Sequence, residues 1–339
     1  RVAYVSTDPG VPVFGRKGAS VHVQAVVREL LRRGAEVHLV AARIGGDLPR
    51  GLDGVIVHEL PKITGTPGAE REASAQRSAR AAADLLARLH HDAPLELVYE
   101  RYSLWSDGAM GWARASGVPG VLEVNAPLID EQAEHRVLVD RAEAERIAAR
   151  AFTSAACVVT VSEPVAQWVI ERMDDPSSVH VVPNGVDTDF IRPGGSAAAR
   201  DEGFTVGFVG TLKPWHGVEV LLEAFVRLAR ADRSARLRIV GDGPQREALA
   251  EQALRLGVRE QVDLVGAVAP EDMPGELAAM DVAVAPYPDL PDFYFSPLKI
   301  YEYLAAGLPV IASGGVTNLD DVRRLLSVQG DGVIGTITG

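Results

Sequence analysis

The chain of 339 residues is poor in cysteine, in aromatic side chains and in basic residues. Its one cysteine, Cys157, lies in an apolar run, which excludes a disulfide within the chain and predicts a buried structural thiol. Lysine and arginine number 34 against 46 acidic residues, a formal net charge of −12 at pH 7. This balance argues against nucleic acid as a bulk electrostatic partner, so any phosphate must be bound by local groups.

Long apolar runs are also missing, because none reaches the ~18 residues that a membrane-spanning helix needs. No signal peptide is visible, and a soluble, cytoplasmic protein is expected. What the chain does have is 47% hydrophobic residues with only 6% aromatic ones, which is typical of an α/β protein rich in Ala, Val and Leu. Its length favours two domains.

The first residues alternate between strand and helix patterns. A β-rich run at 1–6 precedes a Pro/Gly loop at 8–19, and Ser20 is expected to cap a helix that stops at Gly34. The next strand is predicted at 35–42. This unit is typical of a Rossmann-like parallel sheet, whose ligands bind at the carboxyl ends of the strands.

Polar residues end two further predicted strands, 97–102 and 120–125, while 70–91 and 130–156 are expected to be helical. The residues at these strand ends include Glu100, Arg101, Glu123 and Asn125. Paired carboxylates also occur in glycoside hydrolases, which require a defined carboxyl separation. The strand ends are therefore a candidate site, and hydrolysis stays open as a minor alternative.

The second half repeats the alternation. Strands are predicted at 204–210, 237–240, 262–265 and 281–286, and the Gly/Ala-rich segment 194–203 is the best linker. We expect an N-terminal domain over residues 1–193 and a C-terminal domain over residues 204–339, both Rossmann-like.

A short helix is predicted after Ser296, with Ser296 as N-cap, Pro297 as its first residue and Gly307 as the stop. The amides of Leu298 and Lys299 would then be unpaired and suited to a phosphate or diphosphate. Glu302 follows Leu298 by four residues, roughly 6 Å along the axis, about one phosphate-to-ribose step. A capped helix with a solvated glutamate would explain the same residues.

The segment Ser296 to Val310 resembles the S-P-x-K-x-x-E-Y-x-A-x-G-x-P-V helix of retaining GT-B glycosyltransferases of family 4, and the run Pro183 to Phe190 resembles a second signature of that family. The resemblance covers about residues 1–312. It implies a GT-B fold, with two doubly wound Rossmann-like domains facing across a cleft, an acceptor-side domain first and a donor domain second. It also implies a metal-independent hexosyltransferase without a cofactor, which moves a sugar from a nucleotide diphosphate to a hydroxyl acceptor. UDP-sugars are expected ahead of GDP-sugars.

The resemblance also implies roles for individual residues. Those expected to bind the donor are Gly18, Thr211, Val268, Tyr294, Ser296, Leu298, Lys299 and Glu302, with the ribose on Glu302. Those expected on the acceptor side are Gly15, Lys17, Glu100 and Arg101, and the expected catalytic residues are Lys213, His216, Glu123 and Asn125. No metal ligands are expected.

Several positions depart from the family pattern. Thr211 and His216 stand where many members have Arg and Lys, Tyr294 stands where a Glu is usual, and the strand ends lack the His of many relatives. Lys213 would keep part of the charge, although a solvated lysine and a packing histidine fit the residues as well. A nucleotide-sugar-binding protein without turnover is the alternative function.

The last segment resembles another family. Residues 309–339 look like the closing strand-helix-strand of a histidine-biosynthesis ribotide isomerase, a TIM barrel. A barrel needs eight such units and roughly 250 residues, so this piece cannot carry the isomerase reaction. We expect an anomalous tail at 313–339 that leaves the second domain without its closing helices, with an oligomeric state that the residues do not indicate.

Overall fold

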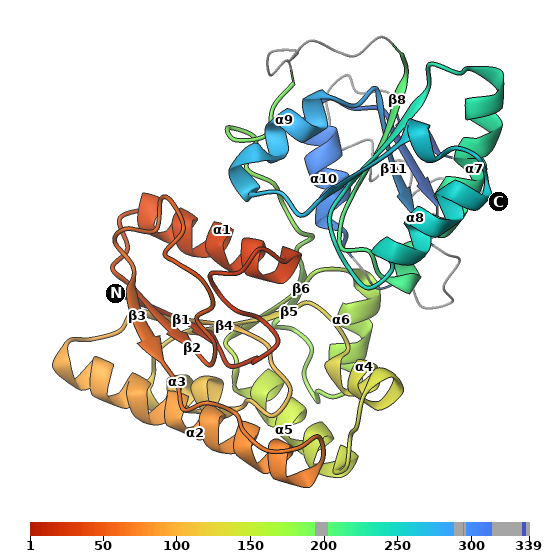
Figure 1. Cartoon of the computed structure of the whole chain (residues 1–339). Helices are drawn as coiled ribbons and strands as arrows, with labels where there is room; N and C mark the ends of the chain where they lie inside the picture. Colours follow the sequence, from red (N-terminus) through yellow and green to blue (C-terminus); the bar gives the residue numbers. More distant parts are fainter. Residues whose placement is uncertain (194–202, 288–293, 295, 314–333, 337–339) are drawn as a thin grey trace. The chain divides into compact units, whose positions relative to one another are not determined.

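The computed structural model describes residues 1–193, 203–287, 294, 296–313 and 334–336. The chain forms two compact units, each built on its own sheet (Figure 1). The N-terminal unit comprises Arg1–Pro183 with Tyr294–Ser296, and the C-terminal unit comprises Asn184–Phe293 with Pro297–Gly339. Almost all of the predicted linker lies outside the described residues.

The N-terminal unit has a seven-stranded sheet in the order β3-β2-β1-β4-β5-β6-β7, and all its pairings are parallel. The strand order reverses between β1 and β4, which is where ligands bind in doubly wound sheets. The strands are β1 Val2–Ser6, β2 Val37–Ala41, β3 Ile56–Glu59, β4 Leu97–Arg101, β5 Gly120–Val124, β6 Cys157–Thr160 and β7 Val179–Val181. The helices are α1 Gly18–Arg32, α2 Ala69–Asp92, α3 Gly108–Ser116, α4 Leu128–His135, α5 Arg141–Ser154 and α6 Glu163–Ile170.

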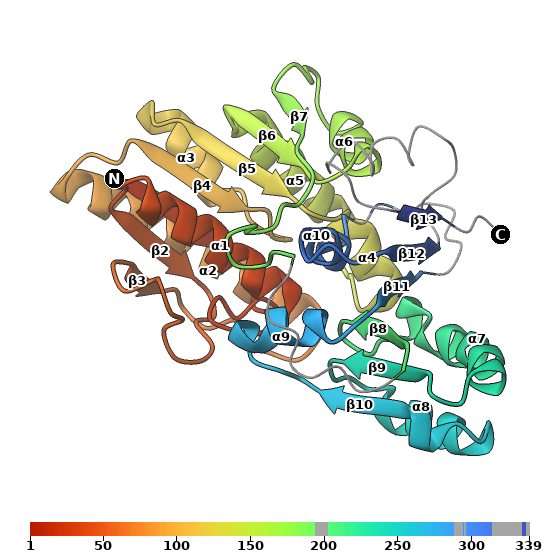
Figure 2. The same ribbon diagram turned by 90° about the horizontal axis from the view of Figure 1, so that it is seen from above.

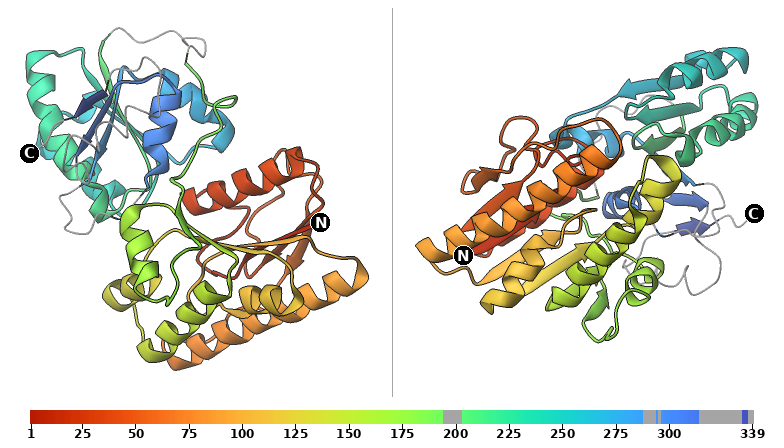
Figure 3. Two further views of the ribbon diagram at one scale, coloured as in Figure 1. Left: turned by 180° about the vertical axis from the view of Figure 1, so that it is seen from behind. Right: turned by 90° about the horizontal axis from the view of Figure 1, so that it is seen from below.

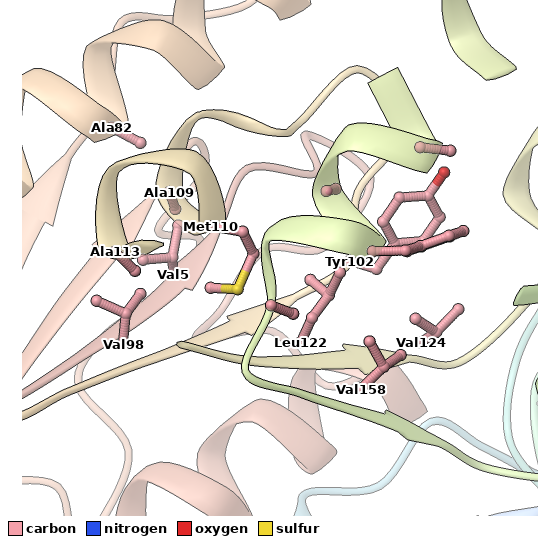
Figure 4. Packing of buried hydrophobic residues seen from close by; sticks show 14 of the residues in the cluster. Val5, Ala82, Val98, Tyr102, Ala109, Met110, Ala113, Leu122, Val124 and Val158 are labelled. Atoms are coloured by element: carbon pink, nitrogen blue, oxygen red, sulfur yellow. The ribbon is translucent and has the colours of Figure 1, made fainter. Parts of the chain in front are cut away.

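Helices cover both faces of this sheet (Figure 3). On one face, Val23 and Val27 of α1 pack with Tyr4 and Leu39. On the other, side chains of α2, α3 and α5 cover the opposite side of the same strands, as Figure 4 shows for Met110 against Leu122. Because successive strand residues point to opposite faces, this division decides which strand-end side chains lie under α1.

The predicted N-cap of the first helix was wrong, and the helical region predicted at 130–156 is confirmed but divided. Helix α1 begins at Gly18 with Lys17 as N-cap, so Ser20 is already helical and completely buried rather than a cap. The predicted helix over 130–156 is two helices, because Asp140 starts α5 by accepting a hydrogen bond from the Glu143 amide at 2.8 Å. The Glu72 carboxylate accepts from the Val139 amide at 2.7 Å and holds the break in place.

The C-terminal unit has a six-stranded sheet in the order β10-β9-β8-β11-β12-β13, seen from above in Figure 2. Helices α7 and α8 pack on one face and α9 and α10 on the other. The strands are β8 Thr205–Val209, β9 Arg236–Val240, β10 Val262–Gly266, β11 Val282–Pro286, β12 Val310–Ser313 and β13 Ile334–Thr336. The helices are α7 Val218–Ala231, α8 Arg246–Arg255, α9 Met273–Ala278 and α10 Leu298–Ala305, with short 3₁₀ turns η1 Pro214–His216, η2 Arg259–Gln261 and η3 Pro270–Asp272.

The start of α10 differs from the prediction by one residue. Pro297 occupies the N-cap position with an extended backbone, and Leu298 is the first helical residue, so Ser296 is not the cap. The Pro297 carbonyl accepts from the Ile300 amide at 3.1 Å. This leaves the amides of Leu298 and Lys299 as the first in the helix, without intrahelical acceptors, as expected.

In the tail, β12 pairs parallel with β11 and with β13 and continues the sheet. The helix predicted between these strands lies outside the described residues. Among the described helices, none combines the length and the apolar character that a bilayer span requires.

Glycine at position 217 is expected to be indispensable for the C-terminal unit. Gly217 has φ +64°, and a Cβ there would lie 1.8 Å from the Pro286 carbonyl oxygen, whereas Gly257 has φ +72° with open space around it. Gly257→Ala should cost about 1 kcal/mol from the left-handed backbone alone. Gly217→Ala should cost about 3 kcal/mol or more because the backbone must also move. Thermal unfolding of the two variants checks this, and equal losses would contradict it.

Candidate functional site

The polar groups of the N-terminal unit gather at the carboxyl ends of β1, β4 and β5. Ser6 pairs with Arg101, and Arg101 pairs with Glu123, so the three residues lie side by side across the sheet. Tyr99 shares their face, where α1 packs. The strand register alone therefore brings together residues far apart in the sequence.

Glu123 is the centre of this group, with only 3% of its side chain exposed. Its carboxylate accepts from Asn125 Nδ2 at 2.5 Å, from Arg101 Nη1 at 3.1 Å and from the Tyr99 hydroxyl. His22 Nε2, from α1, lies 2.8 Å from the same carboxylate. Burial alone would raise the pKa of Glu123, but the contacts with His22, Arg101 and Tyr99 outweigh it and lower the pKa to about 2.

Glu100 points to the opposite face of the sheet. Its carboxyl is completely buried near α3, where Ser106 Oγ donates to it at 2.6 Å. Burial raises the pKa of Glu100 to about 8, so the group is mostly protonated at pH 7. The structure thus brings Arg101, Glu123 and Asn125 together and leaves Glu100 apart from them.

The glycine-containing loop lies before α1. Gln24 Nε2 donates to the carbonyls of Val13 and Gly15, both at 2.9 Å, and holds the loop against the helix. Lys17 is exposed at the N-cap and Gly18 is the first helical residue. Nearby buried hydroxyls have no hydrogen-bond partner within the described part of the chain; they belong to Ser6, Thr7 and Ser20.

In the C-terminal unit, α10 carries the most unusual polar group. Lys299 is 8% exposed, and its Nζ has no hydrogen-bond partner among the described residues. The Nζ lies 4.2 Å from the centre of the Phe208 ring and 5.0 Å from that of Tyr287. Burial lowers the pKa of Lys299 to about 7, against a smaller opposing effect of Glu302.

Glu302 lies one turn after the start of the same helix and is partly exposed. Burial raises its pKa, and the charge of Lys299 partly opposes this. The helix is fastened to β8 by Tyr303, whose hydroxyl accepts from the Val209 amide at 2.7 Å. This hydrogen bond holds α10, and with it Lys299 and Glu302, in a fixed position relative to the end of β8.

The loop after β8 holds the three residues that depart from or supplement the family pattern. His216 Nδ1 bonds the Thr211 carbonyl, and the ring contacts Phe208 and Tyr287. Burial lowers the pKa of His216 to about 4, helped by the nearby charges of Lys299 and Lys213, so the imidazole is neutral at pH 7. It packs as an uncharged ring, while the Lys213 ammonium lies 5.5 Å from the Trp215 ring centre.

The remaining candidates lie elsewhere. Val268 packs partly buried against the C-terminal core. Tyr294 and Ser296 belong to the N-terminal unit, where the Tyr294 hydroxyl donates to Glu131 and its carbonyl accepts from Ser162 Oγ at 2.7 Å. Within the described ranges, no three His, Cys, Asp or Glu side chains are placed to hold a metal ion.

Sequence reasoning missed His22, Tyr99, Phe208 and Tyr287. The first two contact Glu123 and the other two surround Lys299. Tyr99 could have been found, because it precedes Arg101 by two residues on a predicted strand and therefore shares its face. His22 had no comparable signal, since its contact depends on how α1 docks.

Two Rossmann-like units, each with its own parallel sheet, are typical of the GT-B class of glycosyltransferases. The model for Glycosyltransferase Family 4 matches residues 16–190, and the model for Glycosyl transferases group 1 matches residues 203–331. The chain belongs to glycosyltransferase family 4 and is a glycosyltransferase with the GT-B fold, which confirms the predicted family and fold.

Named relatives agree with this class. A D-inositol 3-phosphate glycosyltransferase of Nocardia farcinica is 29% identical over 359 residues, covering 97% of this chain and 75% of that protein. A GDP-mannose-dependent alpha-(1-6)-phosphatidylinositol monomannoside mannosyltransferase of Mycobacterium tuberculosis is 35% identical over 151 residues, covering 41% of this chain and 39% of that protein.

Solved structures share the fold. Anabaena HepE in complex with UDP and glucose has a TM-score of 0.66 at 19% identity, covering 99% of this chain and 85% of that one. WaaG, a glycosyltransferase involved in lipopolysaccharide biosynthesis, has a TM-score of 0.68 at 16% identity, covering 100% and 86%.

The comparisons also bear on the tail. The group 1 model extends to residue 331, so the glycosyltransferase similarity continues through most of the segment with the isomerase-like pattern. The resemblance to a ribotide isomerase gains no support. The strand-helix-strand pattern is common to both folds, so it does not by itself distinguish the two families.

The two buried glutamates should respond oppositely to amide substitution. Glu123→Gln should cost about 3–5 kcal/mol near pH 7, because it leaves Arg101 buried without its counter-charge. The penalty should shrink as pH falls from 4.5 toward 2, where the wild-type carboxylate itself protonates and loses its stabilising contacts. Urea unfolding at several pH values measures this.

Glu100→Gln is the matched control, because Glu100 is also a buried glutamate, on the strand next to that of Glu123, and is already mostly neutral. We expect a change below about 1 kcal/mol at pH 5. Since the folded-state pKa of Glu100 lies above the unfolded one, its contribution to stability is lost as pH rises from 4.5 to 8, and the variant should gain on wild type over that window. A larger loss for Glu100→Gln than for Glu123→Gln would contradict the assignment.

Proposed function

We propose that this glycosyltransferase moves a hexose, with retention and without a metal ion, from a nucleotide diphosphate to a hydroxyl acceptor. The observation that carries the donor assignment is the first turn of α10, which contains the first helix amides and also Lys299, whose buried amine has no hydrogen-bond partner among the described residues. A helix N-terminus with an additional cation favours a diphosphate over a neutral ligand. The proposal thus keeps Leu298 and Lys299 as diphosphate ligands.

Glu302 supports the second half of the donor assignment. It follows Leu298 on the same helix and is held at a fixed height by the Tyr303–Val209 hydrogen bond. A carboxylate can accept hydrogen bonds from both hydroxyls of a ribose, and each such charged hydrogen bond contributes about 1.5–3 kcal/mol. We therefore assign the ribose to Glu302, and the base to the backbone near Val268.

The N-terminal unit supplies the acceptor side in this proposal. The two carboxylate oxygens of Glu123 already contact three hydrogen-bond donors and His22. We therefore propose that Glu123 positions Arg101 and Asn125. Arg101 and Asn125 are then the groups that contact substrate, together with the loop residues Gly15 and Lys17, while Gly18 remains assigned to the donor. The buried hydroxyls at the end of β1 suit a polyhydroxylated ligand.

The loop after β8 has less charge than the family pattern provides. His216 is neutral at pH 7, which leaves Lys213 as the loop's cation, and Thr211 contributes its backbone. Departure of the diphosphate would then be stabilised by Lys213, Lys299 and the α10 amides. The same shortage of charge favours the second candidate, a protein that binds the donor without turnover.

A panel of donors in EDTA tests the function. UDP-, GDP- and ADP-sugars are incubated with the protein and a polyol acceptor, and both transfer and slow donor hydrolysis are followed. We expect turnover of UDP-sugars ahead of GDP-sugars, with the anomeric configuration of the donor kept in the product. Binding of UDP by calorimetry without any turnover would favour the second candidate, and restoration of activity by a divalent metal would contradict metal independence.

Glu302→Ala should weaken UDP binding by about 10- to 100-fold, the loss of one or two charged hydrogen bonds. Its effect on binding of free diphosphate should be small, because the ribose contact is absent there. Glu247→Ala, at an exposed position of α8, is the matched control and should bind UDP like wild type. Equal weakening for UDP and diphosphate would show that Glu302 does not hold the ribose.

A further inference from the structure

We propose, on the basis of the proposed donor site, that Lys299 distinguishes nucleoside diphosphates from nucleosides and takes up a proton from solvent when the diphosphate binds. The lysine would be largely uncharged in the empty site near pH 8 and charged in the loaded one. Donor binding and protonation would then be a single coupled event.

The first support is the confinement of the amine. The side chain is 8% exposed, and the Nζ is so close to the end of β8 that a Cβ added at Gly210 would lie 2.9 Å from it. The faces of two aromatic rings, Phe208 and Tyr287, occupy its surroundings. No hydrogen bond to the Nζ exists within the described residues.

Such confinement makes the charged form costly. A buried ammonium without hydrogen bonds loses its hydration, and ring faces return only part of that energy. Burial accordingly lowers the pKa of Lys299 to about 7. An anion at the start of α10 would supply both the hydrogen bonds and the opposite charge, and would favour the ammonium form.

Other ionisable groups face the same space. Burial keeps the pKa of His216 at about 4, so it stays neutral at pH 8. Burial also raises the pKa values of Tyr287 and Tyr303, which stay protonated. Lys213 contributes a further positive charge from the loop, and Glu302 contributes the negative one, with a raised pKa. Among the described residues, Glu302 is therefore the competing proton acceptor that the experiment must separate.

The experiment is calorimetric titration of the full chain with UDP at pH 8, in two buffers of different ionisation enthalpy. The wild-type protein should take up about one proton per UDP, because Lys299 is mostly neutral before binding and charged afterwards. Glu302→Gln should keep this proton uptake even if affinity falls. Loss of the uptake in Glu302→Gln, or its absence in wild type while UDP binds, would overturn the inference.

Lys299→Met tests the residue directly. It should abolish the proton uptake and weaken UDP binding by about 10-fold or more, while uridine binding changes less than about twofold. Lys62→Met, at an exposed loop position of the N-terminal unit, is the matched control and should behave like wild type. Equal losses for UDP and uridine, or unchanged UDP binding, would overturn the role of Lys299.

Thermal unfolding gives an independent readout. Because the folded-state pKa of Lys299 lies below the unfolded value, the lysine destabilises the empty protein most at and below pH 7 and less as pH rises toward 10.5. Lys299→Met should therefore melt above wild type at pH 7, with a difference that shrinks toward pH 10, and should lose much of the stabilisation by UDP. A lower melting temperature at pH 7 would indicate a merely structural lysine.

The outcomes separate the two levels of the proposal. UDP binding without proton uptake would contradict the proposed role of Lys299 but not the proposed donor site. If UDP, GDP and ADP all fail to bind, both the donor site and the inference are wrong.

Discussion

The free-energy cost of burying a charged group explains how the polar residues of both candidate sites are arranged. In the N-terminal unit, the buried carboxylate of Glu123 is surrounded by hydrogen-bond donors and stays ionised. In the C-terminal unit, the amine of Lys299 is also buried but has no hydrogen-bond partner among the described residues. The Glu123 charge is compensated within the fold, whereas the Lys299 amine gains its counter-charge from a ligand in our proposal.

This contrast follows from where each group sits. Glu123 ends a central strand, so neighbouring strands on one side and α1 above it can all supply partners. Lys299 sits in the first turn of a helix, where the neighbouring backbone offers amides rather than acceptors. The amine and the positive end of the helix both favour an anion, which fits the nucleotide-diphosphate donor that we propose.

Much of the fold could be predicted from the sequence. Strands ending near Arg101, Val124 and Val209 and the helix before Gly307 follow from apolar periodicity and from stop residues, which act over a few positions. Short elements were harder: β3 and β7, with three or four residues each, were not predicted. The split between α4 and α5 was also missed, because the Glu72 carboxylate that holds it comes from a distant helix.

By itself, the sequence determined the order of strands and helices, the family motif at α10 and the presence of polar residues at strand ends, because these depend on neighbours along the chain. Only the tertiary structure decided that Glu100 and Glu123 face opposite sides, that His22 reaches Glu123 and that the Lys299 amine has no hydrogen-bond partner in the described part of the chain. The reason is physical. Burial and pairing are set by strand register and helix docking, which join residues far apart in the chain.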